Sequence, residues 1–283
     1  MSTGEVDVYY RRLDAWNRVA AAVGYGGGRA ALTVHRALAD PRAGGRPTFT
    51  RLHDILVDRL PRMSAPAVLD AGCGLGGTML HLAQTLNATC LGLTLSVAQC
   101  ERANAEAGRR GIGDRVKAVV GSYDDPPGGP YDAIVAIESL AHSADPARTI
   151  EGLARLLAPG GVLAIVDDMP EPEAGADTDL AQFKEGWRLP VLWSAGHYRT
   201  EFARRGLDVS TDVDLTAECR TRSLVQVRSL LALNRLVSAC VPSPALRDVM
   251  RSHRGGLALE RLIRRGLLRY RLLIASRPTL QVS

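Results

Sequence analysis

Residues 67–77 read Ala-Val-Leu-Asp-Ala-Gly-Cys-Gly-Leu-Gly-Gly, and this stretch decides the fold. A short apolar run ends in Asp70, and four glycines follow within six positions. Residues 78–86 are then compatible with a helix. The pattern predicts a buried strand, a glycine-rich turn and the N-terminus of a helix. Glycine lets the backbone adopt positive φ and approach a ligand closely, and the free N–H groups at the helix start favour a negatively charged ligand group.

The chain downstream of this stretch alternates predicted strands and helices. Ser96 and the pair Asp145-Pro146 are suited to cap helix N-termini, and Pro159-Gly160-Gly161 is expected to stop the second of these helices. Alternation of this kind predicts βαβ units, here a Rossmann-like, seven-stranded, mostly parallel sheet with helices on both faces. Strands are expected at residues 89–93, 116–120, 131–137 and 162–166, and helices at 96–110 and 145–157.

The regions on either side of this core are predicted to be mainly helical. Residues 5–60 read as helices with a break at Gly26-Gly27-Gly28. An apolar, arginine-rich helical segment before the last strand suggests a lid. Later elements are expected as a helix at 195–205 and strands at 207–213 and 270–275. The expected units are an N-terminal helical cap (1–62), the core (63–221), a helical lid (222–267), and a final strand with a tail (268–283).

Composition narrows the class of protein. With 283 residues and 46% apolar residues, the chain suits one large globular domain with an elaborated lid. Its apolar runs fall short of the ~20 residues of a membrane helix, and the polar start does not resemble a secretory signal. The five cysteines are scattered, with neither CxxC nor a Cys/His cluster, which favours reduced thiols, a cytoplasmic location and no metal.

The charge is unevenly distributed. Residues 215–283 hold 13 arginines and 3 acidic residues, so this tail carries about +10 against +5 for the whole chain. The tail could be a solvated helix face, a site for an anionic acceptor, or a docking surface for a membrane or an acidic partner. Arg228 and Arg235 are interleaved with leucines there. Net charge alone does not predict nucleic-acid binding, and none is expected.

The glycine turn excludes some nucleotide-like ligands. A phosphate-binding P-loop needs Gly-Lys-Ser/Thr, which is absent here, and the dinucleotide pattern G-x-G-x-x-G does not fit cleanly. Asp70 lies two residues before the first glycine. A carboxylate there would repel a pyrophosphate, but it would attract an amine or a sulfonium.

Four separated motifs resemble one enzyme family. Val68 to Gly77 resembles motif I of the class I S-adenosylmethionine (SAM) methyltransferases. Residues 92–96 resemble the second motif of the branch that contains cyclopropane-fatty-acid, tocopherol, sterol and geranyl diphosphate methyltransferases. Residues 136–142 resemble the fourth-strand motif of small-molecule methyltransferases, and residues 157–161 the turn before the fifth strand. The resemblance extends over residues 66–167 and more loosely to 214.

The resemblance implies SAM as cofactor, S-adenosylhomocysteine as product and no metal. It also implies that a glycine loop contacts the methionine part of SAM, with Asp70 nearby. Many relatives grip the ribose with an acid after the second strand. Thr94 stands at that position here, and the resemblance implies that Gln99 reaches the ribose instead. The loop glycines are Gly72, Gly74 and Gly76.

Adenine recognition departs from the family pattern. Relatives often carry an aspartate after the third strand to accept a hydrogen bond from the adenine amine. Ser122 stands at that position, and Tyr123, which follows it, is suited to stack.

Candidate catalytic residues follow the fourth and fifth strands, where ligands bind in open α/β sheets. In similar O-methyltransferases a histidine at the position of His142 pairs with an aspartate at the position of Asp167, which implies a general base. Glu138 would bind SAM or the acceptor, or stabilise a carbocation. The alternative for His142 and Glu138 is a helix-capping role. Asp168 is expected to face the surface, because adjacent strand residues point in opposite directions.

Aromatic residues outside the core motifs are candidates for the acceptor wall. An N-terminal tyrosine, Tyr25, could close over the site. Three further candidates follow the fifth strand, namely Trp187, Trp193 and His197.

The sequence thus predicts SAM-dependent methylation of a small, lipophilic specialised metabolite on oxygen or carbon. Two alternatives remain open: a SAM-binding enzyme with repurposed chemistry such as a cyclisation, and an RNA or protein methyltransferase. The expected partner is a small-molecule acceptor. Peripheral membrane contact without a transmembrane segment is compatible with the sequence, as is either a monomer or a homo-oligomer.

Overall fold

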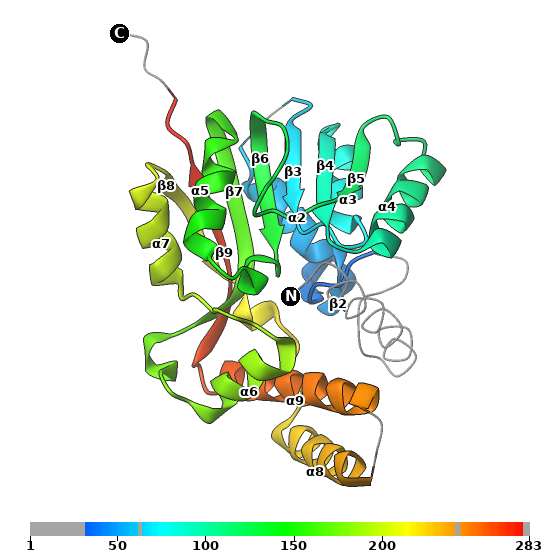
Figure 1. Ribbon diagram of the computed structural model, residues 1–283, viewed down its shortest axis with the longest axis vertical. Coiled ribbons are helices and arrows are strands. Elements are labelled where there is room, and N and C mark those ends of the chain that lie inside the picture. The colour runs from blue at the N-terminus through cyan, green and yellow to red at the C-terminus, as the bar shows by residue number, and fades with distance from the viewer. Residues whose placement is uncertain (1–31, 62–63, 241–243, 280–283) are drawn as a thin grey trace.

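The computed structural model describes residues 32–61, 64–240 and 244–279. Seven strands form one sheet in the order β5-β4-β3-β6-β7-β9-β8 (Figure 1). Neighbouring strands are parallel except β9, which runs antiparallel to both of its neighbours. The predicted mostly parallel, seven-stranded fold is therefore confirmed. The strands are β3 (Ala67–Ala71), β4 (Thr89–Thr94), β5 (Val116–Val120), β6 (Tyr131–Ile137), β7 (Leu157–Pro170), β8 (Asp208–Asp214) and β9 (Leu268–Ser276).

Helices cover both faces of the sheet. One buried apolar cluster joins α2 (Thr50–Arg59), α3 (Gly77–Leu86) and α4 (Val97–Arg109) to one face. A second cluster joins α5 (Pro146–Arg155) and α7 (Ala195–Arg204) to the other. The predicted caps of α4 and α5 are confirmed. Ser96 Oγ accepts a hydrogen bond from Gln99 N at 3.4 Å, and Asp145 Oδ1 accepts one from Arg148 N at 3.1 Å.

Strand β7 is longer at both ends than predicted. The helix before it ends at Arg155 rather than at residue 157, because Leu157 already pairs with Tyr131 of β6. At its other end, β7 continues to Pro170 beside β9, beyond the last residue that pairs with β6. The parallel neighbour β6 therefore pairs with β7 up to Val166, and the antiparallel neighbour β9 pairs with it up to Pro170. The extension places Asp167 and Asp168 within the sheet.

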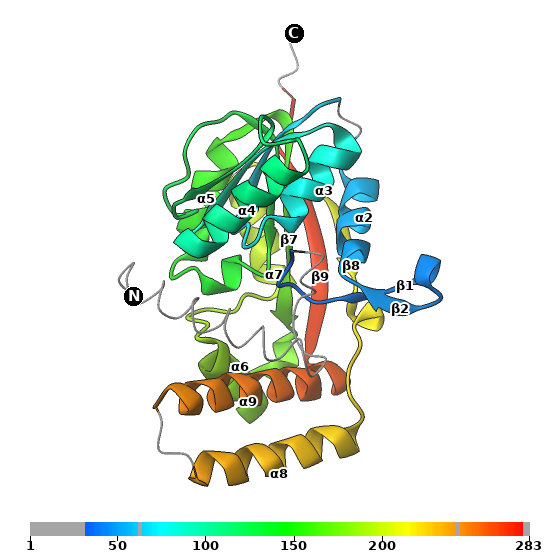
Figure 2. The same ribbon diagram turned by 90° about the vertical axis from the view of Figure 1, so that its right-hand side faces the viewer.

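Three helices form a separate layer below the carboxyl ends of the strands (Figures 1 and 2). They are α6 (Thr178–Trp187), which lies between β7 and β8 in the chain, and α8 (Leu224–Cys240) and α9 (Pro244–Arg264), which lie between β8 and β9, where a helical insertion is predicted. Helices α6 and α9 approach very closely: a Cβ added at Gly186 would lie 2.7 Å from Gly255 Cα. Both glycines are required for this close packing, which is sealed by a third apolar cluster.

The segment before the core differs from the prediction. Instead of continuous helix, residues from 38 onward form a hairpin of β1 (Leu38–Asp40) and β2 (Arg46–Thr48) with a 3₁₀ turn, η1 (Pro41–Ala43), before α2. Asp40 caps this turn and Gly44 and Gly45 have φ of 64° and 79°, a conformation that breaks helices. Residues 5–31 of the predicted N-terminal helices, and with them Tyr25, lie outside the described residues.

Buried histidines anchor this N-terminal segment to the core. The Nε2 atoms of His35 and His53 lie 2.9 Å apart, and Thr78 Oγ1 lies 3.2 Å from His53 Nε2. Burial lowers the pKa of both imidazoles, so they are neutral and one donates to the other. Thr78 opens α3, and the carbonyl oxygen of Leu32 accepts a hydrogen bond from Gly77 N. The segment is therefore fixed directly to the glycine turn.

Gly92 should be needed for the packing of α3 on β4. A Cβ there would lie 2.3 Å from Met79 Sδ and 2.7 Å from Cys73 Cβ, both buried. We expect Gly92→Ala to lower the free energy of unfolding by about 1–3 kcal/mol through overpacking. Gly108→Ala is the matched control, because the added Cβ meets nothing within 4 Å in α4 and should be neutral or stabilising by up to ~1 kcal/mol. Urea unfolding measures both, and equal midpoints would contradict the packing argument.

Candidate functional site

The glycine turn lies at the carboxyl ends of the parallel strands. Gly72, Gly74 and Gly76 have φ of 113°, 52° and 84°. A Cβ on Gly72 would lie 2.5 Å from Ser139 Cβ, and one on Gly76 would lie 2.9 Å from Ala103 Cβ. All three positions therefore favour glycine for backbone conformation, and Gly72 and Gly76 are also required for close contact with neighbouring elements. The turn brings its backbone N–H groups and the N-terminus of α3 to the edge where open α/β sheets bind ligands.

Asp70 is a buried carboxyl group at the end of β3. Burial raises its pKa to about 7. Its Oδ2 atom has no hydrogen-bond partner among the described residues. An uncompensated buried carboxylate favours a ligand that brings positive charge or a hydrogen-bond donor. The geometry therefore fits the amine or sulfonium expected from the sequence.

Thr94 and Gln99 lie together at the end of β4, as the motif resemblance implies. Thr94 Oγ1 donates to Gln99 Oε1 at 2.8 Å and accepts a hydrogen bond from Ser96 N at 3.2 Å. Both side chains are buried. Because the amide oxygen of Gln99 is used by Thr94, the amide N–H groups are what Gln99 can offer to a ligand.

Ser122 and Tyr123 follow β5 and make local contacts. Ser122 Oγ accepts a hydrogen bond from Asp124 N at 3.0 Å, which closes a turn. The Tyr123 hydroxyl donates to the carbonyl oxygen of Ser139 at 3.0 Å and so ties this loop to the loop after β6. The adenine contact of these residues stays a prediction.

Glu138 follows β6 in a strained conformation. Its φ is 48°, which is unusual for a residue with a Cβ, and its N–H donates to the carbonyl oxygen of Val166 at 2.8 Å. Its Oε1 accepts two hydrogen bonds, from the Tyr270 hydroxyl at 2.8 Å and from Arg36 N at 3.0 Å. Strain of this kind persists only where surrounding contacts impose it, and it is common at functional sites.

Arg36 is a site residue that the sequence did not indicate. Its guanidinium donates to Asp168 Oδ2 at 2.7 Å and lies 4.7 Å from the centre of the Tyr270 ring. Only 16% of the side chain is exposed. The arginine precedes a short hairpin strand, so no motif or periodicity in the sequence marks it.

Asp168 does not face the surface as predicted. It is 3% exposed, and burial raises its pKa to about 7 even though Arg36 acts to lower it. Asp167 and Asp168 do point in opposite directions. The prediction was wrong because the N-terminal segment covers the second face of β7 at this level, which brings Arg36 onto Asp168.

His142 and Asp167 are close in the fold, but no hydrogen bond joins them among the described residues. His142 ends a short 3₁₀ helix, η2 (Leu140–His142). Asp167 accepts hydrogen bonds from Ala141 N at 3.1 Å and Asp168 N at 2.9 Å. Burial, with the nearby charges of Asp168 and Glu138, raises its pKa well above the usual value. Asp167 therefore positions η2, and the general-base role of His142 stays a prediction.

The three described aromatic candidates have different surroundings. Trp187 packs edge-on against Phe183 at 5.1 Å between ring centres and belongs to the α6–α9 core. Trp193 is half-buried before α7 and packs against Tyr198 at 5.4 Å. His197 is exposed, and its Nδ1 lies 2.7 Å from Ser194 Oγ at the start of α7. The acceptor-wall role of all three residues stays a prediction.

Much of the arginine excess in the tail is neutralised within the fold. Arg222 pairs with Glu260, and Arg271 with Asp212. Arg261 and Arg265 both pair with Asp179 at the start of α6. The pairs of Arg222, Arg261 and Arg265 hold the insertion together, and that of Arg271 joins β9 to β8.

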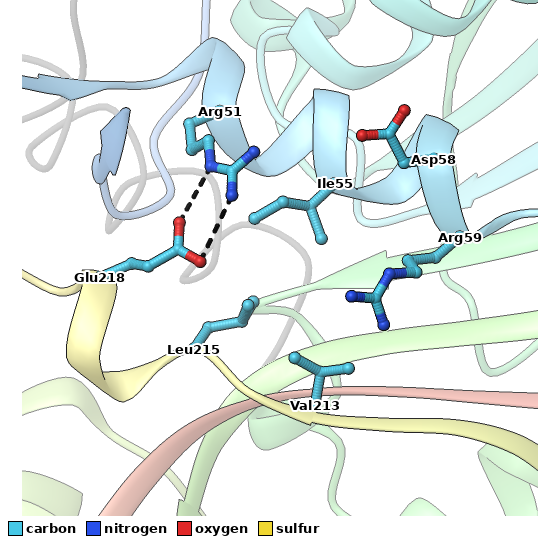
Figure 3. A pocket seen from close by; sticks show the side chains of 7 residues that line it. All are labelled: Arg51, Ile55, Asp58, Arg59, Val213, Leu215 and Glu218. Carbon is cyan, nitrogen blue, oxygen red and sulfur yellow. Dashed lines mark hydrogen bonds and ion pairs between the residues drawn. The ribbon is translucent and has the colours of Figure 1, made fainter. Parts of the chain in front are cut away.

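A small cavity of about 100 Å³ lies on the flank of the sheet, between α2, the end of β8 and the 3₁₀ turn η4 (Thr216–Glu218). Figure 3 shows Arg51 crossing one side of it to Glu218, with Nε–Oε2 at 2.9 Å. None of the predicted site residues lines this cavity, so it is separate from the glycine turn. Its lining residues are Arg51, Ile55, Asp58, Arg59, Val213, Leu215 and Glu218.

Removing the Arg36 guanidinium should strongly destabilise the protein. Arg36→Met leaves the buried Asp168 carboxylate without its partner, and we expect unfolding to become about 3–5 kcal/mol easier in urea. Adding Asp168→Asn should recover part of this loss, since the two side chains are coupled. Arg42→Met is the control: Arg42 is exposed and pairs with Asp54 at 3.2 Å, so its loss should cost at most ~1 kcal/mol. Additive effects of the Arg36 and Asp168 substitutions would contradict the coupling.

Comparison with known proteins finds similarity to methyltransferases. A family model described as "Methyltransferase domain" matches residues 69–163, which include the glycine turn, Glu138 and His142. The 27-O-demethylrifamycin SV methyltransferase of Amycolatopsis mediterranei is 33% identical over 178 residues, 60% of this chain and 64% of that protein. The probable chloroplastic tocopherol O-methyltransferase of Oryza sativa is 28% identical over 75% of this chain and 60% of its own length. The chain thus spans less than two thirds of these relatives.

A solved structure shares the fold over nearly the whole chain. The geranyl diphosphate C-methyltransferase of Streptomyces coelicolor, solved with Mg²⁺, geranyl diphosphate and S-adenosylhomocysteine, has a TM-score of 0.70 and 21% identity, and 97% of each chain is covered. The likeness confirms the Rossmann-like fold that the motifs implied. Residues 69–163 therefore match the methyltransferase-domain model, and the chain around them shares its fold with that solved structure.

Proposed function

We propose that this protein binds SAM at the glycine turn and transfers its methyl group to a small-molecule acceptor. The observation that supports the proposal is Asp70, a buried carboxyl group whose Oδ2 atom has no hydrogen-bond partner among the described residues. It lies in β3 directly before a turn with positive φ at Gly72, Gly74 and Gly76. The family match covers this same stretch. When bound, SAM supplies an activated methyl group on a sulfonium centre.

The residues around the turn fit such a donor. The turn of Gly72, Gly74 and Gly76 and the N-terminus of α3 lie where we expect the methionine part of SAM, and a helix N-terminus suits its carboxylate. Asp70 faces the positive charge of the donor. The N–H groups of the Gln99 amide, which Thr94 orients, are available to the ribose hydroxyls.

The charge balance at the strand ends also favours a cationic donor. Asp70, Glu138, Asp167 and Asp168 are gathered there, and burial raises the pKa of the three aspartates. Arg36 is the positive group paired within this set. A positively charged ligand offsets the cost of keeping these carboxylates ionised.

On the acceptor side, His142 is the proposed general base for a hydroxyl acceptor. Burial lowers its pKa, although Glu138 acts to raise it, so the imidazole is neutral and able to accept a proton near pH 7. Glu138, held by Tyr270 and Arg36, is positioned for an alkene acceptor, whose carbocation a carboxylate stabilises. The names of the curated relatives, an O-methyltransferase of tocopherol and a rifamycin methyltransferase, support a lipophilic acceptor and oxygen as the acceptor atom.

Donor binding should depend on pH through Asp70. A cationic ligand binds the ionised carboxylate, so affinity should be full above the free-state pKa of about 7 and should fall as the pH drops. Between pH 8 and pH 6 we expect SAM to bind about tenfold more weakly. Calorimetry of SAM binding measures this.

Asp70→Asn tests the same assignment. It should weaken SAM binding at pH 8 by at least about tenfold and flatten the pH dependence, because the amide carries no charge. Asp58→Asn, which changes an exposed carboxyl group on α2, is the control and should bind like the wild type. Unchanged affinity in Asp70→Asn would rule out the donor site proposed here.

Kinetics of methyl transfer distinguish the proposed roles of His142 and Glu138. An acceptor is first identified by testing phenols and prenylated compounds for release of S-adenosylhomocysteine. For an oxygen acceptor, His142→Gln should then lower kcat about 10²–10⁴-fold and leave SAM affinity unchanged. In the wild type, kcat should fall as the pH drops below 6.5, because His142 becomes protonated. This fall should be absent in His142→Gln. If Glu138→Gln is the more damaging change, the acceptor is carbon. Near wild-type rates for both would remove them from the chemistry.

Product masses decide between methylation and the cyclisation alternative. Methyl transfer adds one CH₂ to the acceptor and releases S-adenosylhomocysteine. Conversion of an acceptor without a change in mass, in the presence of SAM that is not consumed, would support a cyclase and contradict the proposal.

A further inference from the structure

Helix α8 exposes an unusual amount of apolar surface. The four most exposed large hydrophobic residues among those described are Leu224, Val225, Leu233 and Leu236, with between 52% and 74% of their surface accessible. All four lie on α8. The helix forms the outermost layer of the molecule, on the side of α9 that faces away from the sheet (Figures 1 and 2).

The orientation of α8 is fixed by its inner side, so these residues cannot turn inward. Val227 and Asn234 are buried. The Asn234 amide donates to the carbonyl oxygen of Met250 at 3.0 Å and lies 3.1 Å from His253 Nδ1, both on α9. Val227 and Asn234 are seven residues apart and therefore lie on one stripe of the helix. A buried polar contact of this kind sets the rotation of one helix against another.

The outer side of α8 combines apolar and basic residues. Val225, Ala232 and Leu236 form one stripe at helical spacing, with Leu233 beside it. Arg228 and Arg235, both exposed, lie along one border. Residues 224–240 contain no Asp or Glu. We name this surface, formed by Val225, Arg228, Ala232, Leu233, Arg235 and Leu236, the α8 outer face.

Charge decides which occupant fits the α8 outer face. If two copies of the chain packed through it in antiparallel fashion, Arg228 of one would lie beside Arg235 of the other, and a parallel pair would align each arginine with itself. Neither arrangement offers an acid on α8 to compensate, and like charges in contact destabilise an interface. A bilayer with anionic headgroups instead offers apolar chains and negative charge together.

We propose that the α8 outer face binds an anionic lipid surface, with the helix axis in the plane of the interface. Apolar side chains beside exposed arginines are the features of interfacial helices. No helix among the described residues is long and apolar enough to cross a membrane. Helix α8 would then contact the bilayer, with α9 and α6 between it and the sheet.

Vesicle co-sedimentation tests the apolar part of the surface. The full chain should bind vesicles of phosphatidylglycerol and phosphatidylcholine in equal parts, and bind phosphatidylcholine alone at least about tenfold more weakly. Leu233→Ser/Leu236→Ser should lower the partition coefficient on the order of tenfold or more, because both side chains lose their apolar insertion. Val209→Ser, an exposed apolar residue on β8, is the control and should bind like the wild type.

A second pair of variants tests the charge. Arg228→Gln/Arg235→Gln should weaken binding about fivefold per arginine, or about 25-fold together at low salt, and the effect should shrink as salt is added. Arg109→Gln/Arg155→Gln removes the same charge from exposed positions on α4 and α5 and should have little effect. An equal loss in both pairs would mean general attraction rather than a docking face, and would overturn the proposal.

Two further outcomes also overturn it. One is absence of binding to either kind of vesicle. The other is a wild-type dimer in sedimentation velocity that fails to bind vesicles and dissociates in Leu233→Ser/Leu236→Ser, which would identify a second copy as the occupant. The measurements use neither SAM nor acceptor, so their failure leaves methyl transfer untouched, and a failure of methyl transfer does not affect them.

Discussion

The guanidinium of Arg36 joins the parts of the chain that form the proposed acceptor end of the site. It donates to Asp168 on β7 and covers the Tyr270 ring on β9, while the backbone N–H of the same residue donates to Glu138 after β6. A buried arginine is always charged and has to find its acceptors within the protein. Three strands and the N-terminal segment therefore have to meet at one point, and the strained backbone of Glu138 is held there.

The same interaction leaves negative charge in excess. One guanidinium lies among several carboxyl groups at the strand ends, and burial raises the pKa of Asp70 and Asp168 to about 7. The protonation state of these carboxyl groups therefore depends on the charge of the bound ligand. A cation at the glycine turn and a neutral acceptor beyond it would complete the charge balance, whereas a second anion would add to the repulsion.

Local signals in the sequence were sufficient to predict the strands and helices of the core, but not the contacts made by the segments around it. The glycine turn, the Ser96 cap and the Asp145-Pro146 helix start were predictable because each depends on neighbours within a few residues. Asp168 and Arg36 were not, because their environment arises from a contact across 132 positions in the chain. The hairpin after residue 38 was missed for a similar reason: Asp40 and Gly44-Gly45 indicate a turn, but the pairing of its short strands depends on what packs beneath them.

The connection between β8 and β9 has a consequence for the evolution of this chain. These strands are direct neighbours, so the helical insertion leaves the sheet at Asp214 and returns at Leu268 close by, where Asp214 pairs with Arg271. The ends of the insertion are held at a fixed short separation whatever its length, and lengthening a loop between fixed ends costs little conformational entropy. Helices α8 and α9 can thus be exchanged, shortened or extended with no change in strand register. Specificity for new partners can therefore change in this layer while the donor end of the sheet stays as it is.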